Sequence, residues 1–282
     1  MHKASEKFMR GVFFTAALMS VISVFLICLF LGINGIPAIK EIGVKNFLLG
    51  SEWRPIKGIY GIFPMIIGSI YVTAGGVLSG VPVGILCAVF LAHFCPKALY
   101  RVLKPATDLL AGIPSIVYGF FGLTVIVPLI QRLFGGSGKG VLTASLILGI
   151  MILPSVISVS QAALTAVPKS YYAGALALGA THETGVYKVS LPAAKSGIAA
   201  GVVLGVGRAI GEAMAVSMIA GNQPVVPDGI LSGVRTLTAN IVLEMGYAAG
   251  LHRDALIATA VVLFVFILII NIMFSLINER VK

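Results

Sequence analysis

Two charged residues, Arg208 and Glu212, lie in the middle of an otherwise apolar stretch that runs from Ser196 to Gly221. A charged side chain inside a bilayer costs free energy unless it is paired or faces water. In a helix, residues four apart share a face, and the same face carries three small residues, Gly197, Gly201 and Gly205. Small residues allow another helix or a passing solute to approach the backbone closely. The pair is therefore either a structural ion pair that holds helices together or part of a solute pathway, in which the arginine would suit a tetrahedral oxyanion.

A second candidate for function is the connection from Val167 to Lys195, which separates two apolar stretches. Helix-forming residues lie on both sides of Gly179, which is typical of a turn, and Pro168 suits the start of a helix. The pattern predicts two short helices joined at a bend close to the membrane. Such a pair would form a rigid knob that faces the cytoplasm.

The other reactive side chains form no recognisable catalytic or metal site. The cysteines have no metal-ligand spacing with the histidines, and no nucleophile lies beside a base. The stretch Gly135–Gly140 contains a Gly-Lys pair, but it lacks the first glycine and the final Ser or Thr of a phosphate-binding loop. We interpret it as a flexible outer turn. The sequence therefore indicates a chain that is not an enzyme, has no ATP site, and needs no metal or cofactor.

The composition indicates which elements must position these residues. Of 282 residues, 58% are apolar and 11% are charged, against about 25% charged in a soluble domain. Such a chain cannot cover itself with charge on every side, so we expect an all-α integral membrane protein, since a helix satisfies its own backbone hydrogen bonds in lipid. The net charge of +10 comes from short basic clusters between apolar blocks, which suit lipid head groups and exclude nucleic acid as a partner.

Six apolar blocks are long enough to cross a bilayer as helices, at about 20 residues each. They are Gly11–Leu31, Phe63–Phe94, Asp108–Gln131, Gly140–Val167, Ser196–Gly221 and Ala255–Asn278. The second block is too long for one straight crossing, so Gly75, Gly76 and Pro82 predict a kink or an interfacial first turn. Asp108 is expected to favour the N-terminus of the third helix. We divide the chain into an anchor helix with an outer strap, residues 1–62, and a transmembrane core, residues 63–282.

The distribution of Lys and Arg between the connections predicts the orientation. Basic residues are denser in segments 1–10, 95–107, 168–195 and 279–282 than in segments 32–62, 132–139 and 222–254. Positive residues concentrate on the cytoplasmic side of membrane proteins. Both termini are therefore expected in the cytoplasm.

The Val167–Lys195 segment is similar to the coupling loop of ABC importer permeases, whose pattern is Glu-Ala-Ala, three residues, Gly, nine residues, Ile-x-Leu-Pro. This sequence has Ala173-Gly174-Ala175, then Gly179, then Val189-Ser190-Leu191-Pro192. It departs from the pattern at Ala173, where the family has Glu, and at Gly174. The resemblance implies that the loop docks into a cleft of a separate ATPase subunit, and that the charged contact at this dock lacks its acid.

Three further segments resemble the high-affinity phosphate importer permeases, the PstC type more than the PstA type. They are Gly207–Val216, Leu110–Gly122, and Ser51–Pro55 with Tyr60-Gly61. The likeness covers nearly the whole chain and implies a type I, MetI-like permease core in the bacterial inner membrane, with Arg208 and Glu212 tied to phosphate passage. The partners it implies are two copies of an ATPase subunit, a second, PstA-like permease forming a heterodimer, an extracytoplasmic phosphate-binding protein, and membrane lipid.

Three alternatives stay open on the sequence. The chain could be the PstA-like partner itself, or a permease of the same architecture for another oxyanion. An ion-coupled secondary transporter would carry paired broken helices and inverted repeats, which the sequence does not show. A membrane-embedded enzyme would need a nucleophile and a base side by side.

Overall fold

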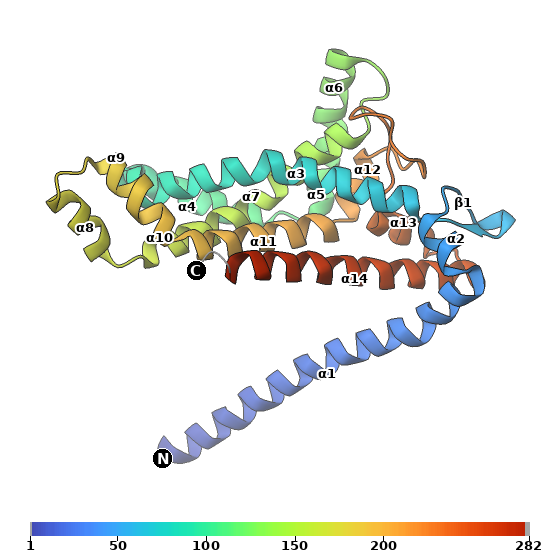
Figure 1. Cartoon of the computed structure of the whole chain (residues 1–282), viewed down its shortest axis with the longest axis horizontal. Helices are drawn as coiled ribbons and strands as arrows, with labels where there is room; N and C mark the ends of the chain where they lie inside the picture. The colour runs from blue at the N-terminus through green and yellow to red at the C-terminus, as the bar shows by residue number, and fades with distance from the viewer. Residues whose placement is uncertain (1, 280–282) are drawn as a thin grey trace.

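The computed structural model describes residues 2–279 and is built almost entirely of helices (Figure 1). In chain order these are α1 (His2–Ile42), α2 (Val44–Leu49), α3 (Phe63–Val89), α4 (Lys97–Gly112), α5 (Ser115–Phe121), α6 (Val127–Phe134), α7 (Val141–Ala166), α8 (Lys169–Ala177), α9 (His182–Gly185), α10 (Leu191–Ala193), α11 (Lys195–Gly211), α12 (Met214–Ile219), α13 (Leu237–Glu244) and α14 (Leu251–Glu279). The π-helical turns Phe90–Phe94, Gly122–Ile126 and Val186–Ser190 join some of them. Most of the predicted inner segment 279–282 lies outside the described residues.

Five helical stretches of the described chain are long and apolar enough to cross a membrane: Met9–Ile42, Phe63–Phe94, Ser115–Phe134, Val141–Ala166 and Leu251–Met273. One further pair of helical stretches, His182–Ala193 and Lys195–Gly211, is apolar enough only when taken together, is bent by 67°, and would make a sixth crossing if it counts as one span. The predicted all-α class is confirmed, and the six predicted spans agree with the five to six that the described helices allow. Apolar length decides this outcome, because a helix in lipid needs no partner for its backbone groups.

The third span begins later than predicted. Lys97–Gly112 forms a separate helix, α4, and the span starts at Ser115. Ile113 is extended, with φ −70° and ψ 125°, because the residue before a proline avoids the helical region and Pro114 follows it. Asp108 therefore does not lie at the start of this span. Its carboxylate accepts a hydrogen bond from Lys104 within α4, over 2.6 Å.

Helices α3 and α7 approach closely because α3 presents glycines to α7. A Cβ atom at Gly80 would lie 2.5 Å from the carbonyl oxygen of Gly149, and one at Gly76 would lie 3.1 Å from the Leu148 side chain. Small residues at such spacing are what membrane helices use to pack. The Gly75-Gly76 pair and Pro82 lie inside α3, which continues past all three to Val89. The glycines thus serve helix packing.

The two ends of the bundle carry different structures (Figure 1). At one end lie α8 and α9, together with the start of α1 and the end of α14. At the other end lie α2, α13 and a two-stranded antiparallel hairpin, β1 (Trp53–Arg54) and β2 (Ile59–Tyr60), in which Trp53 pairs with Tyr60. Helix α1 touches the bundle near its C-terminal end, where Gly35 packs on Ala258 of α14, and it leans away from the bundle toward its N-terminus.

Candidate functional site

Arg208 and Glu212 do not lie on one continuous helix. α11 ends at Gly211, Glu212 is extended with φ −73° and ψ 122°, and a new helix, α12, begins at Met214. The predicted single helix from Ser196 to Gly221 is therefore wrong. The Glu212 carboxylate stabilises the break, because its Oε1 accepts the backbone N–H of Ala215 over 3.0 Å at the start of α12. This use of Glu212 rules out the expected shared helix face with Arg208.

Arg208 and Glu212 also form no ion pair within the described chain. The half-buried Arg208 lies one turn before the end of α11. The neighbouring positions on this side of the helix are open: Leu204 is 57% exposed, and a Cβ atom at Gly207 or Gly211 would meet none of the described atoms within 4 Å. A half-buried arginine without a carboxylate beside an open face is free to bind an anion.

The glycine stripe of α11 faces the interior of the bundle. A Cβ atom at Gly197 would lie 2.4 Å from the Ala163 side chain, and one at Gly205 would lie 2.9 Å from the Val156 side chain, both on α7. The sequence allowed either another helix or a passing solute to approach this stripe. At Gly197 and Gly205 it is another helix, α7. The open face of α11, formed by Leu204, Gly207 and Gly211, is separate from this glycine stripe.

The connection between α7 and α11 has the predicted form of two short helices at a bend. α8 follows Pro168, and Gly179 ends it with φ +86°, a left-handed conformation that glycine adopts without strain. α9 then starts at His182, where the Thr181 hydroxyl accepts the backbone N–H of Thr184. The two helices are joined by a hydrogen bond between the Tyr172 hydroxyl and Nδ1 of His182, over 2.6 Å.

The candidate coupling residues divide into an exposed set and an anchoring set. Ala173, Gly174, Gly179 and Pro192 are exposed, while Ala175, Val189 and Leu191 are half-buried. Leu178, at the bend, is 91% exposed. Leu191 packs on a buried cluster that includes Val89 of α3 and Leu164 of α7. The segment therefore presents an apolar tip on a base that is packed against the spans.

A buried ionic cluster lies at the end of the bundle opposite α8 and α9, and the sequence did not predict it. Glu244, 6% exposed, accepts a hydrogen bond from Nη1 of Arg235 over 2.6 Å and one from the indole N–H of Trp53 over 2.8 Å. Nε2 of His252 lies 2.8 Å from the same carboxylate. These residues come from α13, the loop before it, the hairpin and α14, so the cluster joins the strap to the bundle. The available signals were the single tryptophan and an acid in an outer segment.

Tyr60 stacks on the ring of His252 in this cluster, with centroids 6.3 Å apart. Burial, and to a lesser extent the carboxylate of Glu41, raises the pKa of the Tyr60 hydroxyl above its ordinary value. Tyr60 therefore stays neutral at physiological pH, where it packs as an aromatic side chain.

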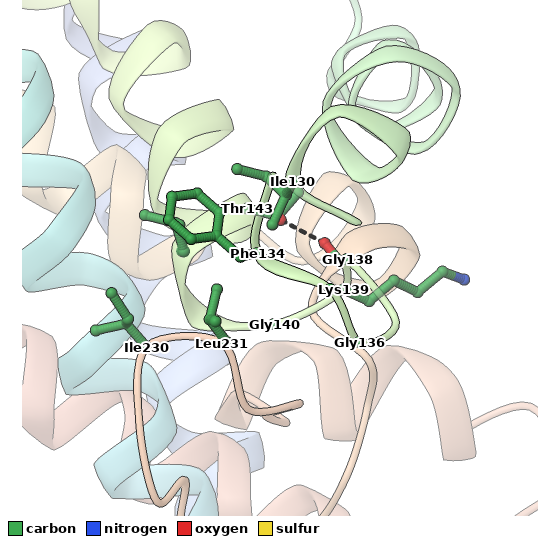
Figure 2. Close-up of a pocket in the computed structure, with 11 residues that line it drawn as sticks. Ile130, Phe134, Gly136, Gly138, Lys139, Gly140, Thr143, Ile230 and Leu231 are labelled. Carbon is green, nitrogen blue, oxygen red and sulfur yellow. Dashed lines mark hydrogen bonds between the residues drawn. The ribbon is translucent and has the colours of Figure 1, made fainter. Parts of the chain in front are cut away.

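The glycine-rich turn at 135–140 does not hold an anion through the N-terminus of α7. The first backbone N–H groups of the helix are already used, since Gly140, Val141 and Leu142 donate to the carbonyls of Ile219, Ser232 and Ile230. The pocket beside the turn has a volume of about 80 Å³, and Lys139 points away from it (Figure 2). Gly135, Gly136 and Gly138 have positive φ, as a tight turn requires.

The sequence pattern of one family, described as the inner membrane component of binding-protein-dependent transport systems, matches residues 80–282. The chain belongs to this family. The matched region includes both Arg208 with its open face and the α8–α9 segment. The predicted permease fold and the resemblance on which it rested are therefore confirmed.

Individual relatives are also permeases of transport systems. A probable ABC transporter permease, YqgH of Bacillus subtilis, is 38% identical over 277 residues, which covers 94% of this chain and 90% of that protein. The phosphate transport system permease protein PstC of Pasteurella multocida is 33% identical over 257 residues, with 84% and 80% covered. The permease is thus of the PstC type.

Solved structures agree on the fold. A chain of the inward-facing MetNI methionine ABC transporter matches with a TM-score of 0.62 at 20% identity, over 82% of this chain and all of that one. A bacterial ABC transporter for the import of alginate matches with a TM-score of 0.67 at 17% identity, over 99% of both chains. The permease is therefore a multi-pass inner-membrane subunit with a MetI-like fold, and its family implies an ABC ATPase and a substrate-binding protein as partners.

Proposed function

We propose that this permease carries inorganic phosphate into the cell in an ATP-driven importer. The observation that carries the proposal is Arg208, which has no carboxylate partner in the described chain and lies beside an open helix face near the end of α11. A guanidinium suits the geometry of a tetrahedral oxyanion. Support comes also from relatives named as phosphate transport permeases, at 33–35% identity.

In this proposal Arg208 offsets part of the cost of removing phosphate from water. Glu212 acts through the backbone: it holds the break between α11 and α12 open and so keeps the end of α11 beside the pathway. The open face of α11 meets a second permease subunit of the PstA type, and the pathway runs between the two. Residues 1–62 add an anchor helix and a strap to the core formed by residues 63–282.

ATP binding would drive the transport cycle through the α8–α9 segment. Two ATPase subunits close on ATP and displace the segment through contacts at the exposed residues Ala173, Gly174, Gly179 and Pro192, while the half-buried Ala175, Val189 and Leu191 transmit the movement to the spans. A shift between outward-facing and inward-facing states requires that ATP stabilise one of them more than the other. The apolar tip at Leu178, 91% exposed, supports this docking role.

The proposal places both termini in the cytoplasm. The start of α1 and the end of α14 lie toward the same end of the bundle as α8 (Figure 1). If α8 meets an ATPase, which needs cytoplasmic ATP, that end is the cytoplasmic one. The hairpin and α13 then lie on the outer side, where a binding protein delivers phosphate.

The test is phosphate uptake by the reconstituted complex with Arg208→Gln and Arg208→Lys, beside a control, Arg132→Gln, at an exposed arginine of α6. We expect Arg208→Gln to abolish uptake while the complex still assembles, Arg208→Lys to retain part of it, and Arg132→Gln to match the wild type. Normal uptake by Arg208→Gln would refute the proposal. Uptake of sulfate, unaffected by excess phosphate, would assign the permease to another oxyanion.

A further inference from the structure

The hairpin of residues 53–60 is a rigid projection at the outer end of the permease. Its strands pair Trp53 with Tyr60 and Arg54 with Ile59, and the turn between them is a 3₁₀ turn, Pro55–Lys57, closed by Gly58 at φ +69°. Left-handed glycine at this position suits a tight turn. The hairpin extends beyond the ends of α3 and α14 (Figure 1).

The base of the hairpin is fixed to the bundle. Trp53 and Tyr60 are 5% and 6% exposed, and the Trp53 indole donates its hydrogen bond to Glu244, which Arg235 holds from the other side. The two aromatic rings meet edge to face, with centroids 5.7 Å apart. A partner that binds this hairpin therefore orders little of it on binding, which reduces the entropic cost of association.

The tip of the hairpin is apolar and basic. Ile56 is fully exposed and Ile59 is 40% exposed. Arg54 pairs with Glu52 at the surface over 3.3 Å, and Lys57 has no carboxylate partner in the described chain. Beside the tip lies a groove of about 590 Å³ whose lining includes Glu41, Asn46 and Glu52. An apolar ridge of Ile56 and Ile59 with the cation of Lys57 thus runs alongside a groove that carries the carboxylate of Glu41 and the Glu52–Arg54 ion pair.

We propose that this ridge and groove are the docking point for the extracytoplasmic binding protein of the importer. The inference rests on the proposed function, which makes this end the outer one. The binding protein would need an apolar pocket for Ile56, with an acidic side chain at its edge to meet Lys57. It would also need a basic side chain to enter the groove beside Glu41.

Two other occupants fit the surface less well. Lipid is disfavoured because the tip extends along the direction of the spans, past their ends (Figure 1), and because the groove carries the carboxylates of Glu41 and Glu52. The second permease is disfavoured because it would lie beside the spans. Steering by complementary charge would also speed encounters with a soluble protein.

The test measures ATP hydrolysis by the complete complex in nanodiscs, titrated with its phosphate-loaded binding protein. The variant Ile56→Asp is compared with Leu49→Asp, at a residue of α2 in the same strap that is 62% exposed and lies off the tip. We expect Ile56→Asp to raise the half-saturating concentration of binding protein at least about tenfold, as for loss of an interface anchor. Basal hydrolysis should be unchanged, and Leu49→Asp should stay within about twofold of the wild type.

A photo-crosslinking amino acid at position 56 gives a second readout that needs no loss of function. It should join the permease to the binding protein, whereas the same group at position 49 should not. A half-saturating concentration for Ile56→Asp within about twofold of the wild type, or crosslinks at position 56 to lipid or to the second permease, would overturn the inference. A wild-type complex that no phosphate-loaded binding protein stimulates would overturn the proposed function as well, which separates the two failures.

Discussion

The hydroxyl of Thr238 donates a hydrogen bond to the backbone carbonyl of Glu212 over 2.9 Å. This bond ties α13 to the break between α11 and α12. The other end of α13 carries Glu244, which accepts the Trp53 indole N–H from the hairpin. One helix of eight residues therefore contacts both the strap and the segment that positions Arg208.

Thr238→Val should weaken the break, because it leaves the Glu212 carbonyl without this donor. The bond is partly buried, so its loss costs about 0.5–1.5 kcal/mol, and the purified permease should unfold at a temperature a few degrees lower. Thr124→Val is the control, since the Thr124 hydroxyl is exposed and bonds to Phe120 within its own helical segment. Equal shifts in the two unfolding temperatures would show that the bond to Glu212 contributes nothing specific.

Glu244→Gln should destabilise the hairpin end of the bundle more than Trp53→Phe. The first change removes the buried carboxylate that neutralises the half-buried Arg235 guanidinium, and breaking a buried ion pair costs up to about 3–5 kcal/mol. The second removes one hydrogen bond and keeps an aromatic ring. Thermal unfolding followed by circular dichroism measures both, with Glu52→Gln as a control at an exposed ion pair worth about 0–1 kcal/mol. The reverse ranking would contradict a dominant Arg235–Glu244 contact.

Gly80→Ala should destabilise the permease, because the new Cβ atom would lie 2.5 Å from the carbonyl oxygen of Gly149. Overpacking of this kind costs about 1–3 kcal/mol. Gly207→Ala lies on the open face of α11 and should be neutral or stabilising by up to about 1 kcal/mol, as for alanine in place of an unconstrained helical glycine. The comparison uses unfolding temperatures of the isolated permease, and a stable Gly80→Ala variant would argue against close α3–α7 packing.

Two substitutions in the α8–α9 segment should change ATPase docking in opposite directions. Leu178→Asp places a charge on the exposed apolar tip and should reduce the amount of ATPase that co-purifies by about tenfold. Ala173→Glu supplies the acid found in the coupling-loop pattern and should increase it. Ser170→Ala is a control at an exposed residue of α8 outside the candidate coupling residues. A normal complex with Leu178→Asp would exclude the tip from the dock.

The fluorescence of Trp53, the single tryptophan, should report the ionisation of Tyr60. The pKa of Tyr60 is raised by burial and by Glu41, so the folded protein keeps the neutral phenol beyond the ordinary value of 10.0. Its packing contribution is complete below pH 10 and is lost as the pH rises through the folded pKa. Emission should be constant from pH 7 to about 10 and fall above it, as tyrosinate 5.7 Å away quenches the indole. Tyr60→Phe should abolish the fall.

Apolar length predicted two of the spans, α7 and α14, well, because the cost of burying backbone polar groups in lipid depends on the segment alone. α7 and α14 match their blocks within a few residues. The predicted start of the third span was wrong because of a local signal, Pro114. In Gly112-Ile113-Pro114 the residue before the proline is extended and separates α4 from α5.

Spacing along the sequence was insufficient to predict which functional side chains lie together. The inference that Arg208 and Glu212 share a face assumed a continuous helix, and the Glu212 side chain instead caps α12. The Glu244 cluster could not be predicted, because Trp53 and Glu244 are 191 residues apart and only the fold brings them together. Periodicity describes single helices, whereas this cluster depends on three segments meeting at one end.

The contact between Trp53 and Glu244 also determines when, during synthesis, the strap can finish folding. The strap leaves the ribosome long before α13 and α14, so its tryptophan has no acceptor and Gly35 has no Ala258 to pack on until nearly the whole chain is synthesised. During that interval α1 is held in the membrane by its own hydrophobicity. Insertion of α14 therefore completes the hairpin end of the bundle, and chains truncated before α13 would expose an unfinished strap to quality-control proteases.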